Sequence, residues 1–358
     1  MTFRKIVPPL VALVLTLPLA ASAAASYRDV LDTPARDSAF AAKSLLNGVA
    51  NAGQRIVAVG QRGHIVLSDD GGKTWTQAKV PVSSDLVAVY FPTPAEGWAV
   101  GHDGIVLHSA DSGATWTRQL DGRSAGELMA SYYAAQAAKG ALGPADSAAA
   151  LVDEAKRIGA QGAENPFLDV WFADANNGFI VGAFNQIFRT ADGGKTWEPW
   201  FHRTENPSRL HLYAIRQVGG ALYIAGEQGT VLKLDAAGNR FVALDTGYKG
   251  SFFGLIGDDG AVLVHGLRGN AFRSSDGGKT WKKVETGLQD GITGAASCGD
   301  KRLVLVSQAG RVLVSDDAGA SFRPVKVEQA SPASAVACLG REGTVMVGAR
   351  GVRTQAIQ

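Results

Sequence analysis

"SDDGGKTW" (Ser68–Trp75) is an eight-residue phrase that this chain of 358 residues repeats with small changes. The copies read SADSGATW at 109–116, TADGGKTW at 190–197, SSDGGKTW at 274–281 and SDDAGASF at 315–322. Their third-position aspartates are 41, 81, 84 and 41 residues apart, and a decayed copy, LDAAGNRF at 234–241, divides the interval of 84. A repeat of about 40 residues with several short strands is typical of a β-propeller.

A second motif lies upstream of the phrase in each repeat. It consists of an apolar run, a turn usually bounded by glycines and another alternating run, as in VAVGQRGHIVLS (57–68) and LVHGLRGNAFRS (263–274). This pattern predicts a β-hairpin whose turn needs the positive φ angles that glycine supplies. The motif occurs seven times, so we predict an all-β fold, a seven-bladed β-propeller over residues 24–358. The last blade ends before an outer strand, and we expect residues 27–31 (YRDVL) to supply that strand and close the ring.

Residues 121–166 carry neither motif and are rich in alanine. Ser124 and Glu127 fit a capping box, and good helix formers follow them. Gly140, Gly143 and Pro144 interrupt this helix, and Asp146 is placed to cap a second one. The segment is therefore predicted to be a helical hairpin inserted between blades two and three.

The N-terminus has the layout of a secretory signal peptide over residues 1–23. Arg4 and Lys5 precede an apolar run, which is followed by Ala21-Ser22-Ala23, a small-residue cleavage signal. We therefore expect an exported, periplasmic protein without direct membrane insertion. Loss of Arg4 and Lys5 takes the formal charge from +2 to 0, which argues against nucleic acid as a partner.

Cys298 and Cys338 are the two cysteines of the chain, and they occupy similar places in successive repeats. In an oxidising compartment they are able to form a disulfide. Bridged Cα atoms must lie within about 7 Å, however, and neighbouring blades need not bring them that close. The sequence leaves both alternatives open, a disulfide or two buried thiols.

The repeated phrase, S/T-x-D-x-G-x-T/S-W/F, is the Asp-box of sialidase-type and related propellers. Its aspartate is expected to accept hydrogen bonds from nearby main-chain N–H groups and hydroxyls, and its tryptophan to cover the turn. Because catalysis needs one constellation rather than five, we interpret the boxes as structural. The residues concerned are Asp70, Asp111, Asp192, Asp276, Asp317, Trp75, Trp116, Trp197 and Trp281.

Two blades share a more particular phrase, VYFPTPAEGWAVGHDG (Val89–Gly104) and VWFADANNGFIVGAFN (Val170–Asn185). Together with the spacing of the boxes, these phrases resemble the photosystem II stability and assembly factor family of seven-bladed propellers. The resemblance implies a non-catalytic accessory or assembly protein that binds protein partners. Similar proteins of non-photosynthetic bacteria imply a membrane complex as partner, for example an exporter of the resistance-nodulation-division type.

A glycoside hydrolase of the sialidase-like Asp-box type is the alternative. Arg62, Arg268 and Arg350 share one repeat position, as an anion clamp requires, and Asp103 and Glu227 lie in equivalent turns. The sialidase phrase F/Y-R-I-P is absent, and so is a Tyr/Glu pair evidently placed as nucleophile and base. The six histidines lack metal-ligand spacing. We therefore predict no catalytic residue, no metal and no cofactor.

The partner-binding surface is predicted on the face opposite the boxes. Strand order places the turns between second and third strands, and the links between blades, on that face. Arginine and aromatic residues are favoured in the cores of protein interfaces. The predicted docking residues are Arg62, Arg268 and Arg350 in the turns and Met129, Tyr132 and Tyr133 in the hairpin.

Overall fold

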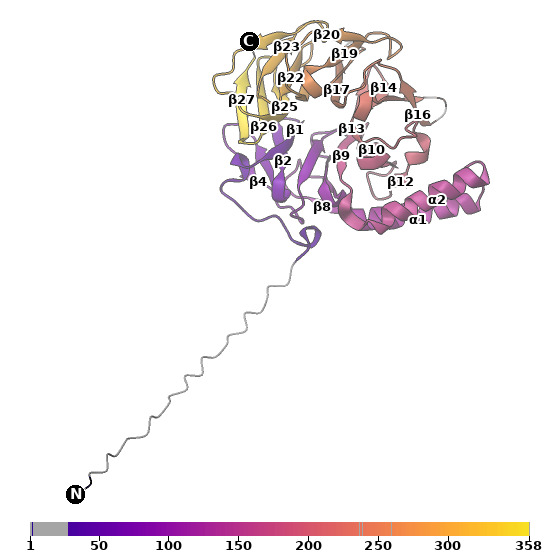
Figure 1. Ribbon diagram of the computed structural model, residues 1–358. Helices are drawn as coiled ribbons and strands as arrows, with labels where there is room; N and C mark the ends of the chain where they lie inside the picture. The colour runs from indigo at the N-terminus through magenta and orange to yellow at the C-terminus, as the bar shows by residue number, and fades with distance from the viewer. Residues whose placement is uncertain (1, 3–27, 236, 238, 259, 358) are drawn as a thin grey trace.

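The computed structural model describes residue 2 and residues 28–357, except 236, 238 and 259. The chain is mostly β and forms seven antiparallel sheets, six of four strands and one of three, together with two α-helices (Figure 1). The predicted signal peptide, residues 1–23, falls outside the described part apart from residue 2. Of the helices that the described residues form, none has the length and apolar character needed to cross a bilayer.

Strands follow one another within each sheet in chain order. The first three sheets are β1 (Leu46–Ala52), β2 (Arg55–Gly60), β3 (Ile65–Ser68) and β4 (Thr76–Gln77); β5 (Leu86–Tyr90), β6 (Gly97–Gly101), β7 (Val106–Ser109) and β8 (Thr117–Leu120); and β9 (Phe167–Phe172), β10 (Gly178–Gly182), β11 (Ile187–Thr190) and β12 (Glu198–Pro199).

The fourth to seventh sheets follow the same plan. They are β13 (Leu212–Val218), β14 (Ala221–Gly226), β15 (Val231–Asp235) and β16 (Arg240–Leu244); β17 (Phe252–Asp258), β18 (Ala261–Gly266), β19 (Ala271–Ser274) and β20 (Lys282–Val284); β21 (Ile292–Ser297), β22 (Leu303–Ser307), β23 (Val312–Ser315) and β24 (Arg323–Val325); and β25 (Ala333–Leu339), β26 (Gly343–Gly348) and β27 (Gly351–Ala356).

The sheets form a closed ring. Their first strands contact one another in the order β1, β5, β9, β13, β17, β21 and β25, and β25 returns to β1. The second strands are apolar runs that are buried almost throughout, such as β6 and β18, so the core lies between neighbouring sheets. We refer to the sheets as blades one to seven.

Blade two packs on blade three through the two phrases that resemble the assembly factor family. The rings of Trp98 and Phe172 are stacked, with centroids 3.6 Å apart. Gly178 pairs with Phe172 across the hairpin, and a Cβ at this glycine would meet the Phe172 ring within about 2.4 Å. An aromatic residue and a partner glycine therefore belong together in this motif, because the ring occupies the space of the missing side chain.

The N-terminal segment is not the outer strand of blade seven. Val30–Asp32 form a 3-10 helix, and Leu31 packs among residues of blades one and two, including Val80 and Val82. Residues 28 and 29 are not in a strand, and Tyr27 lies outside the described residues. The predicted closure by residues 27–31 is therefore wrong for the described part, because burial of Leu31 and the bonds of its neighbours hold the segment elsewhere.

Within the described residues, the ring is closed by packing and not by a shared strand. Asn51 of β1 donates from Nδ2 to the Cys338 carbonyl of β25 at 2.9 Å. A short 3-10 helix, Ala41–Lys43, lies against the start of β27, where Gly351 leaves no room for a Cβ beside the Ala42 carbonyl.

Two helices follow β8 and precede β9 in the chain. They are α1 (Gly122–Ala138) and α2 (Ala145–Ala160), which lie side by side and extend past β12 away from the ring (Figure 1). The close crossing depends on Gly126, whose added Cβ would lie 2.8 Å from Cα of Gly159. Helix α1 begins earlier than Ser124, since Asp121 is its N-cap and Ser124 completes the capping box. Pro144, and not Asp146, precedes α2.

Cys298 and Cys338 form a disulfide between blades six and seven, with Cα atoms 5.5 Å apart. Cys298 follows β21 directly, and Cys338 lies in β25. Neighbouring first strands therefore approach closely enough at this end, which decides between the two alternatives that the sequence left open.

Candidate functional site

Each Asp-box closes the turn between the third and fourth strands, on what we call the box face. In blade five, Oδ1 of Asp276 accepts hydrogen bonds from the main-chain N–H groups of Lys279 and Thr280, both at 3.0 Å. Its Oδ2 accepts from the Thr280 hydroxyl at 2.6 Å. These bonds, the Thr280 hydroxyl first, hold the pKa of Asp276 well below its ordinary value. The Trp281 indole N–H donates to the Gly278 carbonyl at 3.1 Å.

The buried member of this box is the serine and not the aspartate. Ser274 is 1% exposed, and its hydroxyl accepts from the Gly278 N–H at 2.8 Å while it donates to Asp276 at 2.7 Å. The Asp276 carboxylate is exposed, so water is able to replace it as an acceptor. The hydrogen bonds of Asp276 join it to residues of its own turn. The box therefore stabilises the turn, which explains why each such blade repeats it.

We expect Ser274→Ala to lower the free energy of unfolding by about 1–3 kcal/mol, because the Gly278 N–H loses its acceptor in a buried place. Asp276→Ala is expected to lower the free energy of unfolding less, because water is able to replace the exposed carboxylate. Urea unfolding followed by tryptophan fluorescence measures both, with Ser275→Ala at the adjacent exposed position as control. Equal losses for Ser274→Ala and Ser275→Ala would contradict this account.

The opposite face is formed by the turns between second and third strands and by the links between blades, and we call it the link face. The turns pack directly on the links: a Cβ at Gly63 would overlap the Val82 carbonyl, and one at Gly269 the Leu288 carbonyl. The residue before the glycine is exposed in both turns. This is the repeat position that Arg62 and Arg268 occupy.

Five of these turns hold a non-glycine residue in the left-handed region at that position, with Asn185 in place of the glycine in blade three. They are Arg62, Asp103, Phe184, Gln228 and Arg268, with φ between 51° and 58°. A side chain in this region carries a steric cost that glycine avoids. The link face therefore displays side chains from equivalent places around the ring, at a small cost in backbone strain.

Arg62, Arg268 and Arg350 are exposed and belong to three different blades. Arg350 immediately precedes Gly351, the first residue of β27. Within the described chain, none of the three guanidinium groups takes part in an ion pair, although the Arg62 main-chain N–H donates to Asp85 at 2.7 Å. Their charges are thus available to a partner.

Exposed large apolar side chains also occur in the turns and links of this face. Leu267 and Phe184 belong to the turns and are 39% and 45% exposed. Phe40 and Leu45, 69% and 37% exposed, lie on either side of the 3-10 helix that packs on the turn before β27. These four are the exposed large apolar residues of the described chain. Sequence reasoning missed these four residues. Phe40 and Leu45 lie outside the repeat motifs, and in the turns sequence reasoning considered only the arginines and the acidic residues.

The hairpin residues lie differently from the prediction. Met129 and Tyr133 are 1% and 0% exposed and belong to the core shared with blade three. The Tyr133 ring packs on Phe201, with centroids 4.4 Å apart, and its hydroxyl is 2.8 Å from Nδ1 of His202, whose pKa burial lowers to about 4. Met129 and Tyr133 are therefore wrong as docking residues, because blade three covers them.

Tyr132 is half-buried, and its hydroxyl donates to Glu198 of β12 at 2.8 Å. Burial, together with this bond, raises the pKa of Tyr132 to about 12. A second anchor comes from α2, where Glu154 is 6% exposed and pairs with Arg157 and with Arg209 of the link after β12. The helical hairpin is thus fixed to blade three by polar contacts as well as by packing.

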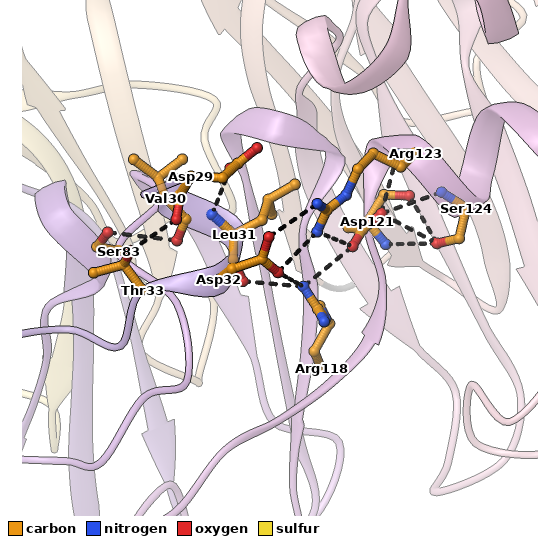
Figure 2. A network of polar contacts seen from close by, with 10 residues as sticks. All are labelled: Asp29, Val30, Leu31, Asp32, Thr33, Ser83, Arg118, Asp121, Arg123 and Ser124. Carbon is orange, nitrogen blue, oxygen red and sulfur yellow. Dashed lines mark hydrogen bonds and ion pairs between the residues drawn. The ribbon is translucent and has the colours of Figure 1, made fainter. Parts of the chain in front are cut away.

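The base of the hairpin is tied to the N-terminal segment (Figure 2). Asp32 accepts from both Nη1 and Nη2 of Arg123, at 3.1 and 3.2 Å, and lies 3.5 Å from Arg118. Asp121, the N-cap of α1, pairs with the same two arginines at 3.2 Å. Hydrogen bonds from Arg123 lower the pKa of Asp32. Residues 29–33 therefore contact the base of the hairpin and are not part of blade seven.

The central channel has a volume of about 680 Å³ and is lined by first strands. Arg216 enters it but pairs with buried Asp169 at 2.5 Å. Tyr213 lies beside Glu227, a Tyr/Glu pair that sequence reasoning missed, and burial followed by the Glu227 charge raises the pKa of Tyr213. Asp103 and Glu227 occupy turns of blades two and four. Arg216 is the one arginine among the described residues that line the channel, whereas a sialidase carboxylate clamp needs three.

Among the described residues, no three His, Cys, Asp or Glu side chains gather as a metal-binding group. The feature of the described chain that suits a binding site is therefore the link face, with its exposed arginine and apolar side chains.

The family described as photosynthesis system II assembly factor YCF48 has a model that matches residues 46–134 and 157–284. The chain belongs to this family. The resemblance seen in the two blade phrases is thereby confirmed. The matched segments leave out residues 135–156, the part of the hairpin farthest along the chain from β8 and β9.

Curated relatives agree with this family. The chain is 27% identical over 168 residues to a photosystem II assembly lipoprotein Ycf48 of Synechococcus sp. (strain CC9902), covering 46% of this chain and 50% of that one. It is 29% identical over 157 residues to the protein of that name from Prochlorococcus marinus, covering 43% and 46%. The chain thus spans about half the length of the curated relatives it matches.

Solved structures share the fold. One is described as YCF48 bound to D1 peptide, with a TM-score of 0.63, 16% identity and coverage of 88% of this chain and 94% of that one. Another is YCF48 from Cyanidioschyzon merolae, with a TM-score of 0.63, 15% identity and coverage of 90% and 98%. At these identities the likeness concerns the fold alone.

Proposed function

We propose that this protein is a non-catalytic, exported propeller that binds a protein partner on its link face and acts as an assembly or stability factor for a membrane-protein complex. The observation that carries the proposal is the presence of exposed apolar residues and unpaired arginines on that one face of the described chain. Exposed aromatic and apolar side chains together with arginine are characteristic of protein interfaces. The left-handed residues of the turns support it, because backbone strain is often retained where a side chain serves a function.

The family supports the same function. Its curated members are named assembly lipoproteins, and one solved relative is described as bound to a peptide. Export agrees with the predicted signal peptide at residues 1–23 and with those lipoprotein relatives. An exporter of the resistance-nodulation-division type stays a prediction for the partner, since neither the fold nor the relatives bear on it.

We expect the triple variant Arg62→Glu, Arg268→Glu and Arg350→Glu to recover at least about tenfold less partner than the natural chain, because charge reversal opposes the same anionic groups that the arginines attract. The measurement is affinity purification from detergent-solubilised envelopes, quantified by mass spectrometry. The expected partner is a membrane protein or a subunit of a membrane complex.

The control variant makes the same charge change on the box face, at Lys73, Lys195 and Lys279, which are exposed residues of three boxes. It should recover partners as the natural chain does, and both variants should keep its melting temperature. A loss of partner in the box-face variant, with full recovery in the link-face variant, would show that the partner binds the box face instead.

A further inference from the structure

Blade seven has an open edge. Its sheet has three strands among the described residues, and β27 pairs only with β26, whereas the third strand of each other blade pairs with a fourth. The fourth strands of the other blades are two to five residues long. The outer edge of this six-residue strand therefore leaves main-chain donors and acceptors without strand partners in the described chain.

The register identifies the main-chain groups that face outward. The Ile357 N–H donates to the carbonyl of Glu342, directly opposite, at 2.9 Å, so these two form a hydrogen-bonded pair. Such pairs alternate along an antiparallel ladder with pairs whose N–H and C=O groups point away from the partner. Val352, Thr354 and Ala356 therefore direct theirs to the open side. Elsewhere in the described chain, no group hydrogen-bonds to the main chain of Val352 or Thr354.

A groove of about 600 Å³ runs along this edge. One wall is β27, and the other is the link of residues 326–332. Arg353 holds the link in place by donating to the carbonyls of Gln329 and Ser331 at 3.0 and 2.7 Å. The groove is thus a built feature with main-chain groups on one side.

The charges at the groove favour an acidic occupant. Lys326, Arg350 and Arg353 line it, against one acidic residue, Glu328. Lys326 and Arg350 take part in no ion pair within the described chain, and Arg350 also belongs to the link face. The groove is therefore continuous with the proposed docking surface and electrostatically complementary to a segment rich in carboxylates.

The path of the N-terminal segment argues against this chain as its own fourth strand. Asp32 is bound beside α1 at blade two, Ser38 donates to Gln77 of blade one, and Ala41–Lys43 reach β27. The chain before Asp32 therefore starts on the side of blade one remote from blade seven.

We propose that the edge of β27 binds an extended, acidic peptide segment of the partner as a fourth strand of blade seven. Strand addition of this kind combines main-chain hydrogen bonds with side-chain complementarity. The inference rests on the proposed function, because it names a place where the bound protein contacts this chain. The observations behind it concern the main-chain groups of β27 and the charges of its groove.

The test is fluorescence anisotropy with a dye-labelled hexapeptide of alternating valine and glutamate and the purified full-length protein. Saturable binding is expected. Thr354→Pro removes an outward N–H without touching the ladder to β26, so it should weaken binding at least about tenfold, equivalent to about 1.4 kcal/mol. Arg350→Glu should weaken it too, whereas Arg268→Glu, at the same turn position of blade five, should not.

A second test changes the peptide and leaves the protein unchanged. Methylation of the alternate peptide nitrogens whose N–H groups would face β27 should abolish binding. Lysine in place of glutamate should weaken it. Equal binding of the methylated peptide, or of Thr354→Pro with its fold intact, would overturn the proposal. A concentration-dependent dimer that Thr354→Pro abolishes would also overturn it in favour of a second copy. If these peptide tests fail while affinity purification still recovers the partner with the natural chain and not with the triple arginine variant, the proposed function stands and the strand-addition proposal falls.

Discussion

Tyr133→Ala is expected to lower the free energy of unfolding by about 3–5 kcal/mol, the usual cost of emptying an aromatic site in a core. Tyr133 is completely buried between α1 and blade three, where it contacts Phe201 and His202. Denaturant unfolding measures the loss, and hydrogen exchange in residues 122–138 shows whether the hairpin detaches first.

Two conservative variants separate packing from hydrogen bonding. Tyr133→Phe keeps the ring but removes the bond to His202, and we expect a loss of about 1 kcal/mol. Tyr132→Phe removes the bond to Glu198 at a half-buried place and should cost less. If Tyr133→Ala lost partner binding at undiminished stability, this residue would belong to the docking surface after all, contrary to its burial.

The double variant Cys298→Ala and Cys338→Ala is expected to lower the free energy of unfolding by about 2–4 kcal/mol. The disulfide spans a sequence separation of 40 and joins blades six and seven. Removing it frees the unfolded chain from a closed loop, and it also releases a covalent tie beside the blade that has only three strands in the described chain.

Reduction of the natural chain with dithiothreitol supplies the matched measurement. The reduced protein should unfold at nearly the same denaturant concentration as the double variant, and the variant itself should not respond to the reductant. An unchanged midpoint after complete reduction, verified by thiol titration, would show that the bridge does not contribute to stability.

The sequence by itself predicted what depends on short-range chemistry. Box turns and hairpins need particular residues within a few positions, such as the serine, aspartate and glycine of Ser274–Gly278, so each repeat can be recognised alone. The same holds for the helical segment between blades two and three, although α1 is capped by Asp121 with Ser124 completing the box, and α2 begins after Pro144, which makes no side-chain cap bond. The shared blade phrases led to the family in the same way.

Only the tertiary structure decided what depends on distances across the ring. No local pattern shows that Met129 and Tyr133 face blade three, or that Asp32 meets Arg123 at the hairpin base, since these contacts join segments far apart in sequence. The approach of Cys298 to Cys338 likewise depends on how blades six and seven meet. The open edge of β27 belongs here as well. Burial of Leu31 among residues of blades one and two, a long-range effect, determines where residues 28–33 pack, and the described residues supply no fourth strand to β27.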